Sequence, residues 1–226
     1  MPLRKADKCS GTPVSRGKSV QIVLEGFGIL ILWHAAGGYF LAPFLGRIFS
    51  GCPSLVIDML SSSGISPAIA AFYLYLRTRS VPRLVWQREV LVYMLAGIVL
   101  AWIITYLSIL VFLDKDIALA QDIARMPAPC KYLLLFLLTF WGPVIEETLN
   151  RGFFFEILSK EWNRPFALLF SSAIFVVSHG IWGGFEPALI LIFGYSVILT
   201  LLYIEAGLLV SVSTHMFINA YLFYLN

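Results

Sequence analysis

Long apolar runs, separated by short polar segments, are the main pattern of the chain. A helix needs about 20 apolar residues to cross a bilayer. By that rule, seven runs qualify as candidate spans, at roughly 20–45, 54–76, 89–113, 131–157, 164–183, 187–204 and 207–225. The polar stretch 61–64 and Pro67 interrupt the second run, and the last two runs are short. The pattern therefore predicts an all-α fold, a polytopic transmembrane helix bundle of about seven spans.

The amino-acid composition is that of an integral membrane protein. Of the 226 residues, 59% are hydrophobic and 13% are charged, whereas a soluble domain carries about 25% charged residues. The net charge of +3 is small. Because the basic residues gather in loops, this charge indicates membrane topology rather than binding to nucleic acid. We expect residues 1–19 to form a basic cytoplasmic tail and residues 20–226 to form a single transmembrane domain.

Basic residues are concentrated in alternate loops. The N-terminal tail is basic, and so are the loops after the second and fourth runs, whereas the loop after the third run is balanced. Loops rich in Lys and Arg stay in the cytoplasm. We therefore expect the N-terminus on the cytoplasmic side. The basic residues are Arg4, Lys5, Lys8, Arg16 and Lys18 in the tail, Arg77, Arg79, Arg83 and Arg88 after the second run, and Arg151, Lys160 and Arg164 after the fourth.

The three cysteines, Cys9, Cys52 and Cys130, lack the spacing of a metal site. No C-x-x-C pair is present, and an odd number does not suggest a disulfide framework. The sequence therefore predicts neither disulfides nor a metal cluster.

Two adjacent carboxylates, Glu146 and Glu147, lie inside the fourth apolar run. A charge buried in the bilayer costs about 2.5 kcal/mol or more, and two like charges also repel each other. An ionisable residue in a membrane span is a candidate functional residue by default. This pair is therefore the first candidate for a site within the bundle.

Two of the three histidines, His179 and His215, fall in later runs. Glu146 precedes the turn near Trp162 by sixteen residues, and His179 follows it by seventeen. At 1.5 Å per residue, both would lie roughly 25 Å from the turn and could meet in a helical hairpin. His215 lies only about ten residues from its own turn, so it would reach that depth only if the turn is sunk into the bundle.

Helical spacing adds further pairs to this set. Glu147 and Arg151 are four residues apart, as are His215 and Asn219, so each pair shares a helix face. Pro143 precedes the carboxylates and removes a backbone donor, which predicts a kink that opens space for water.

These residue types are suited to hydrolysis. A buried carboxylate next to water can act as general base, while histidine and an asparagine amide can stabilise an oxyanion. Alternatively, Glu146, His179 and His215 supply the two histidines and one carboxylate of a hydrolytic zinc site.

Three motifs occur in order on successive apolar runs: E-E-x-x-x-R, F-x-x-x-H and H-x-x-x-N. They contain Glu146, Glu147, Arg151, Phe175, His179, His215 and Asn219. Each motif alone is weak. Together, within apolar runs, they resemble the CPBP family, whose members are CAAX prenyl proteases of the second type and bacteriocin-processing enzymes (also called the Abi family). The motif region covers about residues 131–225.

The resemblance implies an intramembrane endopeptidase that cleaves near the terminus of a membrane-associated protein or peptide. In that reading, Glu146 is the water-activating base and His179 helps to activate the water or bind the intermediate. His215 and Asn219 form the oxyanion hole. The supporting residues are Glu147, Arg151 and, as a wall of the pocket, Phe175.

The family has been discussed both as metalloproteases and as glutamate-type proteases. We favour the glutamate type, with no cofactor, because the sequence has no carboxylate clearly placed to orient a zinc-bound histidine, Glu147 being the nearest candidate. Zinc held by Glu146, His179 and His215 is the alternative. The expected partners are a membrane-associated substrate and the lipid bilayer, in the cytoplasmic membrane of a bacterium or archaeon, with no nucleic acid.

Two rival functions are consistent with the apolar pattern. A non-catalytic relative, acting as an immunity or scaffold protein, would keep the fold and tolerate loss of Glu146 and His179. A proton-coupled transporter would use the same residues as a proton relay. Seven candidate spans without a visible inverted repeat disfavour the transporter.

Overall fold

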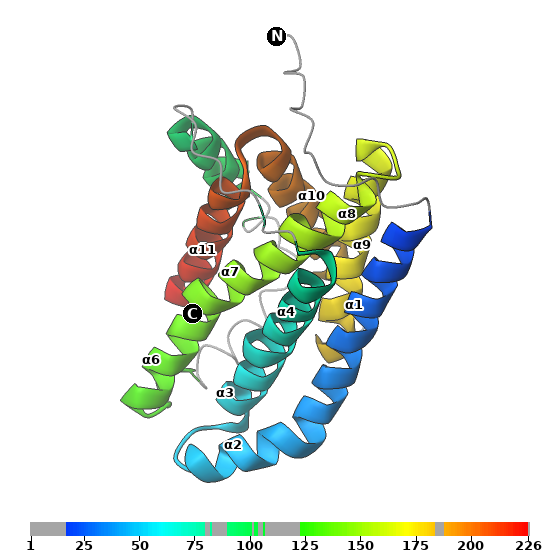
Figure 1. Ribbon diagram of the computed structural model, residues 1–226. Helices are drawn as coiled ribbons and strands as arrows, with labels where there is room; N and C mark the ends of the chain where they lie inside the picture. The colour runs from blue at the N-terminus through cyan, green and yellow to red at the C-terminus, as the bar shows by residue number, and fades with distance from the viewer. Residues whose placement is uncertain are drawn as a thin grey trace.

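The computed structural model describes residues 17–79, 82, 90–100, 102–103, 106, 123–183 and 188–225. Over these residues the chain is helical and contains no strand, so the predicted all-α fold is confirmed. The predicted basic tail lies almost entirely outside the described residues. Figure 1 shows the helices packed side by side as a bundle, with α6–α8 crossing it obliquely.

The first two predicted spans form a hairpin of two long helical rods. Each rod contains a π-helical turn, labelled η, between two α-helices, so the rod is continuous although its hydrogen-bonding pattern changes. The elements are α1 (Lys18–Ala36), η1 (Gly37–Leu41), α2 (Ala42–Ile48), α3 (Ser54–Met59), η2 (Leu60–Ile65) and α4 (Ser66–Thr78).

The C-terminal half, which carries the predicted motifs, consists of one long helical rod and three α-helices without a π-helical segment. The rod contains two π-helical segments, one on each side of the short helix α7. The elements are α6 (Ala128–Phe136), η3 (Leu137–Trp141), α7 (Gly142–Glu147), η4 (Thr148–Phe155), α8 (Glu156–Leu158), α9 (Arg164–Gly183), α10 (Ala188–Ala206) and α11 (Leu208–Leu225).

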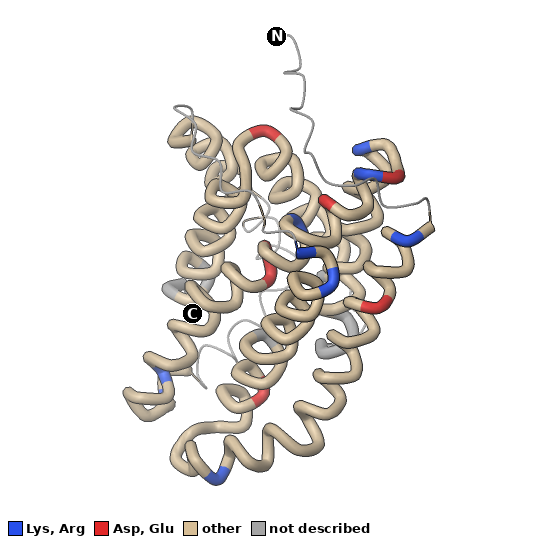
Figure 2. Tube along the Cα trace, viewed as in Figure 1, with Lys and Arg blue, Asp and Glu red and all other residues tan. Residues whose placement is uncertain are grey.

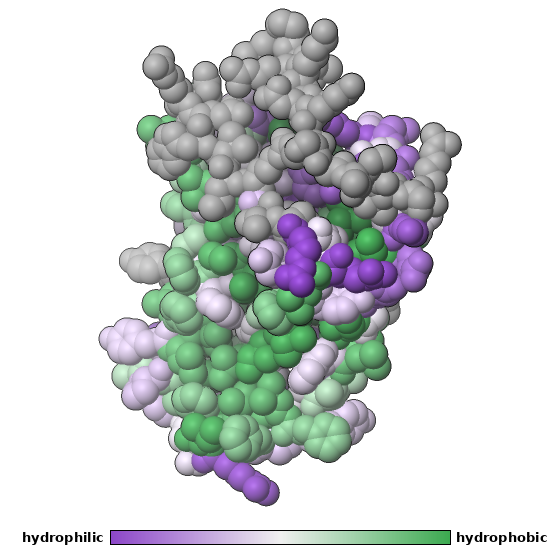
Figure 3. All heavy atoms as spheres, in the orientation of Figure 1, coloured by the Kyte–Doolittle hydropathy of each residue, from purple (hydrophilic) through white to green (hydrophobic). Residues whose placement is uncertain are grey.

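Four helices of the described part are long and apolar enough to cross a membrane, and two shorter apolar helices accompany them. The surface supports the same conclusion, because large apolar side chains such as Leu32, Phe40 and Ile190 are exposed. Figure 3 shows a broad apolar face, and Figure 2 shows charged residues mainly towards the ends of the bundle. The protein is therefore an integral membrane protein, while the count of seven spans stays a prediction. The four long helices are Lys18–Ile48, Ser54–Thr78, Ala128–Leu158 and Leu189–Ala206, and the shorter ones are Val90–Leu100 and Arg164–His179.

Prolines follow three of the four π-helical turns at a fixed distance. Pro43, Pro67 and Pro143 each stand two residues after the end of η1, η2 or η3, at the second position of the next α-helix. Proline has no N–H, and its ring clashes with the carbonyl four residues earlier in an α-helix. A wider π turn relieves that clash, which explains why the chain inserts one at these places. The polar stretch 61–64 does not break the second span, because it is part of η2.

Helices α10 and α11 are joined by a single residue, Gly207. Its φ of +88° is a left-handed conformation that glycine adopts without strain, and its N–H donates to the Tyr203 carbonyl at 2.9 Å. The flanking residues Ala206 and Leu208 are buried. The neighbouring Glu205 is exposed and the turn lies at an end of the bundle (Figure 1), so it is not sunk into the bundle as the depth argument for His215 required.

Cys52 and Cys130 form a disulfide, so the prediction of no disulfide was wrong. The two residues are 78 positions apart in sequence, with a Cα–Cα distance of 5.4 Å. Local spacing carries no information about such a pair, because only the fold brings the α2–α3 turn next to the start of α6. The bond ties the first hairpin to the helical rod that carries Glu146.

Replacing both Cys52 and Cys130 by Ser should lower the free energy of unfolding by about 2–4 kcal/mol, because the crosslink restricts the unfolded chain. Thermal unfolding in detergent would measure the loss, and Cys9→Ser is the matched control. An oxidised wild type no more stable than the double variant would contradict a structural role for this bond.

Candidate active site

The short helix α7 places the two predicted carboxylates in different environments. The Glu147 side chain is fully buried, whereas 17% of the Glu146 side chain is exposed. Neighbouring residues on a helix point in directions about 100° apart, since one turn takes 3.6 residues. Glu147 therefore faces the interior of the bundle, and Glu146 faces a cavity.

Glu147 accepts hydrogen bonds from three side chains, which lie on two helical segments, η4 and α11. Its Oε1 atom is 2.8 Å from Arg151 Nη1 and 2.9 Å from His215 Nδ1, and its Oε2 atom accepts from the Ser211 hydroxyl. A buried carboxylate stays ionised only when charge and hydrogen bonds replace water. This carboxylate has both, as the spacing of Glu147 and Arg151 predicted.

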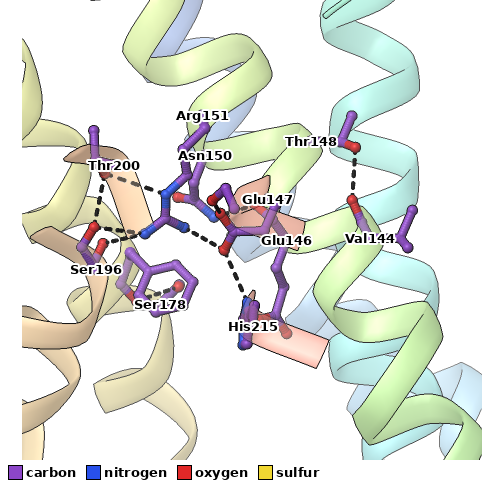
Figure 4. A network of polar contacts seen from close by, with 12 residues as sticks. Val144, Glu146, Glu147, Thr148, Asn150, Arg151, Ser178, Ser196, Thr200 and His215 are labelled. Carbon is purple, nitrogen blue, oxygen red and sulfur yellow. Dashed lines mark hydrogen bonds and ion pairs between the residues drawn. The ribbon is translucent and has the colours of Figure 1, made fainter. Parts of the chain in front are cut away.

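Arg151 is buried with Glu147 and extends the network to α10 (Figure 4). Its Nη2 atom donates to the Ser196 carbonyl at 2.9 Å and to the Ser196 hydroxyl at 2.8 Å, and its Nε donates to the Thr200 hydroxyl at 3.3 Å. The guanidinium also lies over the Phe175 ring, 4.8 Å from its centre. One cation therefore connects the α7 rod with α9 and α10.

His215 connects the two carboxylates. Because its Nδ1 donates to Glu147, the opposite ring nitrogen, Nε2, is directed towards Glu146 and lies 3.9 Å from Oε2. That distance is too long for a direct hydrogen bond and suits a bridging water. His215 reaches Glu146 although it is close to its turn, because the oblique course of α6–α8 reduces the depth spanned by the sixteen residues after Glu146 (Figure 1).

A cavity of about 60 Å³ joins Glu146 to His179, as their equal distances from the α8–α9 turn predicted. About 10–15 Å³ is enough for one water, so this cavity is roomy enough for water beside the carboxylate. The His179 Nδ1 donates to the Phe175 carbonyl at 2.8 Å, which leaves Nε2 available. The Phe175 ring packs 4.3 Å from the His179 ring and 6.3 Å from the His215 ring, so it walls the site as expected.

Asn219 has a different contact from the one suggested by its spacing to His215. Its side-chain N–H donates to the Leu138 carbonyl at 2.9 Å. Leu138 is five residues before Pro143, so this is the carbonyl that the missing N–H of Pro143 would have served in a π turn. In this structure Asn219 therefore joins α11 to η3, and its role in an oxyanion hole stays a prediction.

Several polar residues of the site were not selected from the motifs. Ser196 and Thr200 are four residues apart on α10, and Ser211 is four residues before His215, so helical spacing was the available signal. Their hydroxyls look ordinary in an apolar run until the buried ion pair identifies their partners. The cavity is also lined by His34, Ser62, Asn150 and Ser178.

The alternative metal site gains no support from the arrangement of side chains. Within the described residues, no group of three or more His, Cys, Asp or Glu side chains is placed to hold a metal ion. The set of Glu146, His179 and His215 is therefore not gathered as a ligand group in this structure, and zinc binding by these residues stays a prediction.

The fold and the site place this protein in the class of polytopic membrane proteins that contain a polar site, here of carboxylates and histidines, within their membrane-spanning helices. Residues 128–221 match the family model described as type II CAAX prenyl endopeptidase Rce1-like. This match confirms the resemblance drawn from the motifs, and the matched segment includes every motif residue. Neither the curated proteins nor the solved structures contain a match to the chain.

Replacing Arg151 by Ala should destabilise the protein by about 3–5 kcal/mol, because Glu147 would remain buried without its counter-ion. The midpoint of thermal or denaturant unfolding in detergent measures this effect. Arg164→Ala, which removes an exposed arginine, should stay within about 0.5 kcal/mol of wild type. Equal stability of the two variants would show that the ion pair does not hold the bundle together.

Proposed function

We propose that this protein is an intramembrane endopeptidase in which Glu146 activates a water for attack on a peptide bond near the terminus of a membrane-associated protein. The family match supports a protease. The observation that carries the proposal is the difference between the carboxylates: Glu147 is saturated by Arg151, His215 and Ser211, whereas Glu146 faces a cavity that it shares with His179.

The proposed reaction begins with a water between Glu146 and the substrate amide. Glu146 accepts a proton from the water while the water oxygen attacks the amide carbon, and a tetrahedral intermediate forms. The new oxyanion accepts hydrogen bonds from protonated imidazole nitrogens of the site. The C–N bond then breaks as Glu146 returns the proton to the leaving nitrogen, and the products are a carboxylic acid and an amine, which become a carboxylate and an ammonium group when the acid passes its proton to the amine.

The histidines take different parts in this scheme. His179 has its Nδ1 fixed by the Phe175 carbonyl, so its Nε2 is the atom that can meet the water or the intermediate. His215 has its Nδ1 fixed by Glu147, and its Nε2 lies near Glu146. Asn219 would complete the oxyanion hole only after giving up its bond to the Leu138 carbonyl. We therefore rank Asn219 behind the two histidines in this role.

A zinc-dependent version of the same hydrolysis is the second candidate. It is favoured by the Glu147–His215 hydrogen bond, since zinc-binding histidines commonly donate their other ring N–H to a carboxylate. It is disfavoured by the placement of the candidate ligands. A non-catalytic immunity or scaffold protein of the same fold remains the alternative that loss-of-function variants test.

We infer that the N-terminus faces the cytoplasm. The start of α1 and the α8–α9 turn lie at one end of the bundle, where the Ser19 N–H donates to Glu161 at 3.0 Å, and this end carries the basic residues Lys18, Lys160 and Arg164. Basic loops favour the cytoplasmic side. The Cys52–Cys130 bond joins the opposite ends of these helices, and disulfides persist in oxidising compartments outside the cytoplasm. Two independent features thus support one orientation.

The two glutamates should respond differently to substitution. Glu146→Gln should reduce cleavage by about 10²–10⁴-fold with little change in stability, because it removes a base and breaks no buried ion pair. Glu147→Gln should lower the free energy of unfolding by about 3–5 kcal/mol, because it leaves Arg151 unpaired. Cleavage is measured by mass spectrometry of new termini in membrane proteins, and unfolding in detergent. Full proteolysis by a folded Glu146→Gln variant would reject Glu146 as the base.

Metal removal separates the two mechanisms. For a glutamate-type protease, activity should survive prolonged chelation, and elemental analysis of the purified protein should give well under one zinc per chain. Stoichiometric zinc, together with activity that chelation removes and zinc restores, would establish the metal-dependent mechanism instead.

A further inference from the structure

A second cavity, of about 470 Å³, adjoins the small cavity at Glu146. His34 and Ser62 line both cavities, so the two meet at these side chains. The larger cavity lies between the first two helical rods and is lined by His34, Ala35, Gly38, Tyr39, Asp58, Ser61 and Ser62. None of these residues belongs to the three motifs, and all of them precede the segment that the family model matches.

The larger cavity opens towards the end of the bundle that carries the disulfide. Asp58 lies in α3, six residues after Cys52, and it is exposed. Tyr39, in η1, is 81% exposed. His34, by contrast, is buried, and it stands at the inner end, where the two cavities meet. The lining thus runs from an exposed carboxylate to a buried imidazole beside the catalytic cavity.

The lining is suited to a polar peptide segment. Ser61 donates to the Asp58 carbonyl at 3.0 Å, so its oxygen keeps lone pairs for an incoming N–H. Asp58 is the one carboxylate among the described lining residues, and no Lys or Arg stands among them. The exposed end of this cavity, where Asp58 lies, therefore favours a cationic group of the substrate over an anionic one, because opposite charges attract and like charges repel.

We propose that this second cavity is a substrate subsite that binds a neutral or Lys/Arg-bearing peptide segment next to the scissile bond, entering from the disulfide end of the bundle. The proposal rests on the proposed proteolysis at Glu146. It identifies the preferred substrate as one that presents a basic residue, rather than a free terminal carboxylate, to Asp58. In the orientation argued above, this segment lies on the side of the membrane opposite the N-terminus.

The charge preference is tested with internally quenched peptides built on a sequence found cleaved in membranes. Lys, Leu or Glu is placed in turn at three positions on each side of the scissile bond. At one or more positions, wild type should prefer Lys over Glu in kcat/KM, and Asp58→Asn should reduce that ratio about fivefold, as for a partly exposed charge pair. Asp58→Lys should reverse the preference. Glu205→Gln, an exposed acid at the other end of the bundle, is the control and should leave the ratio unchanged.

The route is tested without any catalysis, by labelling single cysteines in a Cys9→Ser background. A membrane-impermeant maleimide should label Ser62→Cys from the disulfide side of the membrane and Arg79→Cys from the opposite side, with orientation calibrated in intact cells and inverted vesicles. Labelling of Ser62→Cys only from the Arg79 side, or from neither side, would overturn the proposed route.

A negative result in either test can be distinguished from a failure of the proposed function. An enzyme that cleaves peptides with the same charge preference in wild type, Asp58→Asn and Asp58→Lys would overturn the subsite and keep the protease. A protein that cleaves nothing would overturn the protease, and with it the assignment of the cavity to a substrate, even if Ser62→Cys is labelled from the disulfide side.

Discussion

The burial of the Arg151 guanidinium against Glu147 is the interaction on which the rest of the structure depends. Neither side chain has access to water, so each charge is stabilised by its partner and by polar groups of the protein: the Ser196 carbonyl and hydroxyl for Arg151, and the Ser211 hydroxyl and His215 imidazole for Glu147. Removing either member would leave a charge in an apolar interior, at a cost far above that of an exposed pair. The positions of α7, α10 and α11 are therefore fixed together.

The ion pair also makes the two carboxylates unequal, as the proposed hydrolysis requires. Glu147 takes the hydrogen bonds of Arg151 Nη1 and His215 Nδ1, whereas Glu146 is approached by His215 Nε2 at 3.9 Å, beyond direct hydrogen-bonding distance. Glu146 keeps a carboxylate facing a cavity large enough for water, with imidazole nitrogens around it. The site is thus rigid at Glu147, where hydrogen bonds hold the carboxylate, and open at Glu146, which faces the cavity. The rigid side determines the geometry of the open side, because both glutamates are on α7.

The sequence predicted the helical class, the pairing of Glu147 with Arg151 and the meeting of Glu146 with His179, because these follow from helical periodicity and hairpin length. It did not predict the Cys52–Cys130 bond or the partners of Arg151 on α10, because these depend on how distant helices pack. His34 lines both cavities, yet a single histidine in an apolar helix carries no functional signal until a neighbouring helix supplies the other wall of the cavity.

The prolines that follow the π turns have a consequence for assembly. In a π turn the N–H that Pro143 lacks would have bonded to the Leu138 carbonyl, and this carbonyl accepts a bond from Asn219 of α11 instead. Pro143 thereby sets the height at which α11 attaches to the helical rod. A proline after a π turn can thus fix the register between two helices, in a membrane where apolar side chains alone would let the helices slide.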